Sequence, residues 1–248
     1  MNIFLLTSYL SLPILVIGII FLSIKIKAKN LRFLLAFSAA YLFAISVTHL
    51  LPECYDHADA KTIGVFILIG FFIQIVIEYF SAGIEHGHVH AHTDICKKHL
   101  PLGMVTGLFL HSLLEGLPIY QSSAIITDSS ALLSTQQSLL FGLALHNIPI
   151  AIAFVTLLLE HKTSKFKTII LLIAFAFMAP LGCFISYILN TIGMQNYDGF
   201  LKLSFAVVIG IFLHISTAIM FETGENHRYN FAKIMSMIAG VFLATLIS

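Results

Sequence analysis

A histidine and a glutamate stand four residues apart inside a very apolar stretch of the chain, LFLHSLLEGLPIY at 108–120. On a helix, side chains at positions i and i+4 lie on one face, with Cβ atoms about 5–6 Å apart. His111 and Glu115 therefore present an imidazole and a carboxylate to the same small volume. Ionisable groups are rare in apolar segments of this kind and mark pathways or buried sites. The pair predicts a functional site, because two such groups on one face both need partners.

A second apolar stretch, LALHNIPIAIAF at 143–154, supplies a candidate partner. His146 and Asn147 precede Pro149, and a proline removes a backbone donor and disturbs the preceding turn. Such irregular backbone is tolerated at membrane depth where it lines a cavity. Two imidazoles with one carboxylate suit Zn²⁺ and similar first-row divalent metals, whereas Mg²⁺ and Ca²⁺ prefer oxygen ligands. The predicted ligands are His111, Glu115 and His146, with Ser112 and Asn147 as polar neighbours.

The composition indicates which solvent surrounds these segments. The chain has 248 residues, of which 58% are hydrophobic and only 10% are charged, against about 25% charged in soluble domains. Such a chain cannot cover itself with a solvated surface, so the bilayer must be its solvent. The formal net charge of +1 argues against a nucleic-acid partner. Cys54, Cys96 and Cys183 are far apart and form no CxxC pair, so no disulfide framework or thiolate metal site is indicated.

Eight apolar runs are long enough to cross a membrane, since a helix needs roughly 20 residues to span about 30 Å of hydrocarbon. The sequence therefore predicts an all-α membrane protein, with one transmembrane domain over 1–248 and a histidine-rich loop at 83–99. An even number of spans places both termini on one side. The runs lie at about 3–24, 32–52, 62–82, 100–120, 136–159, 166–190, 200–221 and 230–247.

Basic residues in the loops predict the orientation. Of the 13 lysines and arginines, all but Lys61 and Lys202 follow the first, third, fifth or seventh run. An excess of Lys and Arg marks the cytoplasmic face, so both termini are expected to be extracytoplasmic. The residues on the basic side are Lys25, Lys27, Lys29, Arg32, Lys97, Lys98, Lys162, Lys165, Lys167, Arg228 and Lys233.

Several motifs together resemble the ZIP family of divalent-metal transporters. HSLLEG (111–116) is similar to the fourth-helix signature of that family, and HNIPIA (146–151) to its fifth-helix signature. HLLPE (49–53), APLG (179–182) and GIFLHI (210–215) occupy the places of its second, sixth and seventh helices. The resemblance implies a 3+2+3 arrangement, in which the fourth and fifth helices carry the metal between two inverted three-helix units. Secondary transporters commonly hold their substrate at such a repeat interface.

The resemblance also assigns roles to polar residues outside the predicted ligands. His49 and Glu53 resemble entrance groups on the outward side, and His214 is assigned to that side or to the path. Many relatives carry an Asn after the fourth-helix His and a Glu after the fifth-helix Pro, which help to hold a second metal. This chain has Ser112 and Ile150 at those positions, and Ala179 where some relatives add a carboxylate. A single-metal site is therefore expected.

The loop IEHGHVHAHTDICKKH at 84–99 carries a histidine at every second position from 86 to 92. Neutral imidazole is the commonest metal ligand, and short histidine-rich tracts indicate metal binding. The loop predicts an exchangeable metal site on the cytoplasmic face; the alternative is a solvated linker that binds metals only incidentally. Its candidate ligands are His86, His88, His90 and His92.

The sequence thus predicts a transporter, not an enzyme, that moves Zn²⁺ or a related cation (Fe²⁺, Mn²⁺ or Cd²⁺) into the cytoplasm. The metal is the substrate, and no catalytic cofactor is expected. An intramembrane zinc hydrolase is the alternative, but it needs a general base, and with Glu115 used as a ligand no second mid-helix carboxylate is suitable. A proton-driven carrier without metal would explain Glu115 but not the histidine loop.

The expected location is a bacterial inner membrane or a plasma membrane. The sequence is also compatible with a homodimer.

We expect replacement of His86, His88, His90 and His92 by alanine to leave a substantial maximal transport rate while altering metal sensitivity or turnover. The reason is that the loop lies outside the predicted helical core. Zinc flux into vesicles, followed over a range of concentrations, measures both quantities. Complete loss of flux in a normally inserted quadruple variant would contradict this expectation.

Overall fold

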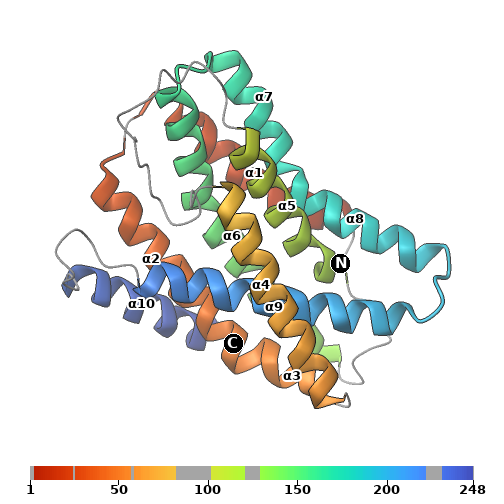
Figure 1. Ribbon diagram of the computed structural model, residues 1–248. Coiled ribbons are helices and arrows are strands. Elements are labelled where there is room, and N and C mark those ends of the chain that lie inside the picture. The colour runs from red at the N-terminus through yellow and green to blue at the C-terminus, as the bar shows by residue number, and fades with distance from the viewer. Residues whose placement is uncertain are drawn as a thin grey trace.

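The protein is described here by a computed structural model that covers residues 3–24, 26–56, 59–81, 102–120, 129–221 and 231–247 (Figure 1). Within these ranges the regular secondary structure is entirely helical, which confirms the predicted class. A π-helical turn (Ser46–Leu50) joins α2 to α3, and a 3₁₀ turn (Leu117–Ile119) follows α5. The α-helices are α1 (Ile3–Phe21), α2 (Ala28–Ile45), α3 (Leu51–Tyr55), α4 (Ala60–Ser81), α5 (Leu102–Gly116), α6 (Ser129–Glu160), α7 (Lys165–Ala176), α8 (Met178–Thr191), α9 (Tyr197–Phe221) and α10 (Phe231–Ile247).

Seven helical segments in the described part of the chain are long and apolar enough to cross a membrane. The eighth predicted run corresponds to α10, an apolar helix of 17 residues. Large apolar side chains lie exposed on the outer faces, for example Leu12 (61% exposed), Leu68 (58%) and Phe72 (62%). Such faces suit hydrocarbon, since a soluble protein rarely exposes large contiguous apolar patches.

Several helix boundaries differ from the apolar runs, and three of the differences have a structural explanation. The run at 166–190 divides at Phe177 into α7 and α8, because Pro180 has no N–H to donate to the Ala176 carbonyl four residues earlier. The helix after the long connection begins at Ser129 instead of 136, since hydropathy marks the part inside lipid and not where a helix begins. The second run continues through its π-helical turn to Tyr55.

The helices pack in two groups (Figure 1). In the first, α10 packs on α2, α4 packs on α9, and α2 also contacts α9. In the second, α1 packs on α6 and α7, and α5 packs on α8. Contacts of α2 with α6 and of α4 with α5 join the groups. The inverted relation between two three-helix units stays a prediction.

The crossing of α4 and α9, visible in Figure 1, depends on two glycines. A Cβ atom on Gly70 of α4 would overlap the backbone of Val207, and one on Gly210 of α9 would overlap the backbone of Ile67. Small residues at a membrane helix interface let the two backbones approach closely. The same side of α4 continues into Gln74 one turn later, so this contact determines how close Gln74 lies to the rest of the bundle.

Replacing Gly70 with alanine should force α4 and α9 apart and cost roughly 1–3 kcal/mol, as overpacking does. The measurement is the melting temperature of the purified protein in detergent. Gly64 on the same helix provides the matched control, because a Cβ there would meet only the Tyr55 hydroxyl at 3.5 Å. Gly64→Ala should melt near the wild type; equal melting temperatures for the two variants would contradict the proposed role of the crossing.

Candidate metal centre

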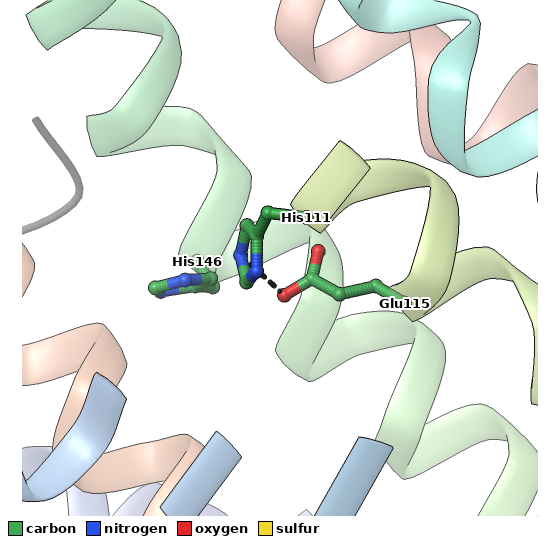
Figure 2. A group of neighbouring side chains, drawn as sticks. All are labelled: His111, Glu115 and His146. Atoms are coloured by element: carbon green, nitrogen blue, oxygen red, sulfur yellow. Dashed lines mark ion pairs between the residues drawn. The ribbon is translucent and has the colours of Figure 1, made fainter. Parts of the chain in front are cut away.

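The three predicted ligands meet in the interior of the bundle. The side chains of His111, Glu115 and His146 are each 0% exposed, and one ligand atom from each lies within 4.8 Å of the other two. Figure 2 shows the His111 ring of α5 between the Glu115 carboxylate of the same helix and the His146 ring of α6. By residue type and spacing, these three side chains could hold a metal ion.

The geometry within this group follows from helix periodicity. His111 and Glu115 are one turn apart on α5, and the His111 Nε2 atom lies 2.9 Å from Glu115 Oε1 (Figure 2). The His146 ring comes from α6 and meets the His111 ring edge to face, with centroids 6.2 Å apart and planes at 82°. Helix α6 passes through Pro149 without ending, so the proline three residues after His146 does not break the helix.

A close approach of α5 to α8 fixes the helix that carries Glu115. A Cβ atom on Gly116 would overlap the Ala179 carbonyl, and one on Gly182 would overlap the Leu113 carbonyl. The glycine of HSLLEG and the glycine of APLG are therefore the two halves of one helix contact. This contact explains the APLG motif physically: its glycine admits the backbone of α5.

Ser112 and Asn147 are buried beside the predicted ligands, with exposures of 0% and 1%. In the described part of the chain, Ser112 Oγ and Asn147 Oδ1 have no hydrogen-bond partner. Buried oxygen atoms of this kind are costly, at about 1–3 kcal/mol each, and they suit the neighbourhood of a cation or its bound water. Both residues thus fit the predicted role of polar neighbours.

Two of the three positions at which relatives carry additional ligands are apolar here and fully buried. Ile150 and Ala179 are each 0% exposed. Neither side chain has an electron pair to donate, so the negative charge described in this group comes from Glu115.

Sequence reasoning missed Gln74. It lies on α4 and is 0% exposed, and its Oε1 atom lies 3.2 Å from His111 Nδ1. A usable signal was present, because Gln74 stands alone as an amide in the apolar stretch ILIGFFIQIVIEYF at 67–80. It was overlooked because an uncharged residue on a different helix cannot be connected to His111 without the fold.

His214 lies outside the three-residue group and pairs with Glu78. The His214 Nδ1 and Glu78 Oε2 atoms are 3.6 Å apart, with the two side chains 12% and 30% exposed. The His214 ring also packs edge-on against Phe71, at 4.8 Å between centroids. Glu78 is one turn beyond Gln74 on α4, so polar groups continue from the buried group toward the C-terminal end of that helix.

His49 and Glu53, the predicted entrance residues, stand on the π-helical turn and on α3, and both are half-buried. The turn is shown by the Leu51 N–H, which donates to the Ser46 carbonyl five residues earlier. π-Helical turns are frequent at functional sites. Neither residue joins the metal-ligating group found in the described ranges, so their entrance role stays a prediction. The loop histidines His86, His88, His90 and His92 lie outside the described residues.

The sequence model of the ZIP Zinc transporter family matches residues 101–248, which include α5 to α10 and all three predicted ligands. The chain belongs to the ZIP zinc transporter family. The resemblance drawn from its motifs is thereby confirmed, as is its character as a multi-pass membrane protein of a metal-transporter family. A search of curated proteins found no match. The match does not extend over α1 to α4. The roles of three residues in that part of the chain therefore rest on the structure alone: His49, Gln74 and Glu78.

Proposed function

We propose that this ZIP-family protein moves Zn²⁺, or a related divalent cation, into the cytoplasm through a single-metal site formed by His111, Glu115 and His146. The observation that carries the proposal is the convergence of these three fully buried side chains, with ligand atoms within 4.8 Å of one another. Metal ligands are one of the few arrangements that make buried ionisable groups tolerable. A hydrolase would need a further carboxylate as general base, and the group in the described ranges contains only Glu115.

The spacing of the ligand atoms fits a small cation. In a tetrahedral zinc site with bonds of about 2.0–2.1 Å, neighbouring ligand atoms lie roughly 3.3 Å apart. Ligand atoms within 4.8 Å of one another reach that spacing through small side-chain rotations. Three protein ligands leave a coordination position for water, and an incomplete protein shell suits transport, because a permeating ion must bind weakly enough to leave.

The charge of the group supports one metal and not two. Two dications a few ångströms apart repel strongly in a poorly hydrated site, so a second ion needs bridging negative charge. Glu115 is the one carboxylate in the group, and Ile150 and Ala179 contribute none. Ser112 and Asn147 add neutral oxygens, which can help to bind one ion but do not offset the repulsion between two.

The inward direction rests on the predicted orientation of the chain. If the basic loops are cytoplasmic, the C-terminal end of α4 faces the cytoplasm, and Gln74 and Glu78 lead from the buried site toward that end. Both termini would then face outward.

Cysteines introduced at the termini should be labelled by an impermeant reagent from the outer side only, and labelling only from the cytoplasmic side would overturn the orientation.

Purified wild-type protein should bind one Zn²⁺ per chain at the buried site, and Glu115→Ala should abolish that binding, because it removes the only charged ligand. Ser112→Ala is the matched control on the same helix: deleting a buried hydroxyl without a partner should change affinity little. Calorimetric titration of a quadruple alanine variant of His86, His88, His90 and His92 measures the buried site without the loop. A zinc-soaked structure with two fully occupied metals between α5 and α6 would refute the one-metal site.

Reconstituted vesicles test the function itself. The wild type should carry Zn²⁺ across the bilayer, and Glu115→Ala should lose the flux while keeping its melting temperature and its insertion into vesicles. Ser112→Ala should retain most of the flux. A protein that binds Zn²⁺ but leaves the vesicle contents unchanged would contradict transport and favour the hydrolase.

A further inference from the structure

Gln74 is a polar residue whose place transport alone does not explain. It is fully buried on α4, between the glycine that meets α9 and the half-exposed Glu78. Burying an amide without a hydrogen bond costs roughly 1–3 kcal/mol or more. Its Oε1 atom lies 3.2 Å from His111 Nδ1, on another helix and 37 residues away in the chain. The contact crosses from one helix group to the other.

The chemistry of the two atoms determines what this contact does to the ring. An amide oxygen only accepts hydrogen bonds, so the contact requires the proton of a neutral imidazole to be on Nδ1. The electron pair is then on Nε2, the nitrogen that lies 2.9 Å from Glu115 Oε1. A nitrogen electron pair and a carboxylate oxygen facing each other are a favourable pair of ligands for a cation.

We propose that Gln74 is a positioning residue for the metal site: its amide oxygen holds the His111 ring with Nδ1 protonated and Nε2 directed at the metal. This inference rests on the proposed function. Ring nitrogens of metal-binding histidines commonly donate to such a partner, and loss of the partner typically costs 10–100-fold in metal affinity or activity. A neutral amide orients the ring without adding a second negative charge to the site.

The position of Gln74 depends on the packing of α4. Gly70, one turn earlier on the same helix, allows α4 to lie against the backbone of α9, and α4 in turn packs on α5. Gln74 therefore reaches His111 from a helix whose position is set by a close backbone contact one turn earlier on the same face. A rigid support of this kind is what a residue needs in order to restrict the orientation of a ligand.

The test compares two replacements of Gln74 in the full chain. Gln74→Met keeps an unbranched side chain of similar length but has no acceptor oxygen, and Gln74→Glu keeps an oxygen at the same reach. Zn²⁺ affinity is measured by titration, the metal environment by the absorption spectrum of bound Co²⁺, and folding by the melting temperature. Ile77→Met, a buried position on the same helix, controls for altered packing of α4.

We expect Gln74→Met to bind Zn²⁺ about 10–100-fold more weakly and to give an altered Co²⁺ spectrum, with a melting temperature near that of the wild type. Gln74→Glu should bind at least as tightly as the wild type, and Ile77→Met should match it. If Gln74→Met does not fold, Gln74→Leu provides a second apolar replacement. The Zn²⁺ affinity of Gln74→Glu is in that case compared with the wild type alone.

The outcomes separate this inference from the function on which it rests. Wild-type affinity and spectrum in the apolar variant would overturn the role of Gln74 and leave the metal site intact. An equal loss of affinity in Gln74→Glu would also overturn it, since an acceptor oxygen would then not be what matters. A wild-type protein that binds no Zn²⁺ would overturn the proposed function, and this inference with it.

Discussion

A carboxylate moved from water into an apolar interior loses several kcal/mol of solvation, and it is tolerated only where a partner or a metal compensates. Glu115 is in that position, with 0% of its side chain exposed in the middle of a membrane protein. The surrounding structure can be understood from this constraint. His111 and His146 are placed beside the carboxylate, and buried oxygens of Ser112 and Asn147 lie on neighbouring positions. A cation is the partner that all of these groups would share.

The close helix contacts give this group its geometry. Gly116 and Gly182 bring α5 onto α8 beside Glu115, and Gly70 and Gly210 bring α4 onto α9 one turn from Gln74. Without a hydrophobic driving force between helices in lipid, close packing and interhelical hydrogen bonds hold such a bundle together. Helix α5, which carries His111 and Glu115, thus meets α8 backbone to backbone, and α4, which carries Gln74, meets α9 in the same way. These contacts limit how far the three side chains can shift.

Transport sets a limit on how strongly the site can bind. A closed four-ligand zinc cage binds very tightly, whereas a carrier must release its ion. In the proposed site, one carboxylate, two imidazoles and neutral neighbours are a moderate set of ligands, and the apolar Ile150 and Ala179 add none of the charge that a second metal would need. A neutral Gln74 behind His111 is consistent with the same limit, because it directs the ring without increasing the negative charge.

The sequence by itself determined the all-helical membrane class and the family, and it singled out three side chains, predicted as ligands, that the fold brings together. These conclusions depend on local properties: apolar runs of bilayer length, the i, i+4 spacing of His111 and Glu115, and short motifs. The sequence also gave approximate spans, but not the break before Pro180 or the π-helical turn at Ser46–Leu50, because hydropathy measures burial in lipid and not backbone hydrogen bonding. Only the tertiary structure decided that Gln74 meets His111, that Glu78 meets His214, and that the glycines of HSLLEG and APLG touch. Each of these contacts joins residues on different helices, and the crossing of helices is set by the shapes of both partners, which no single segment of the chain contains.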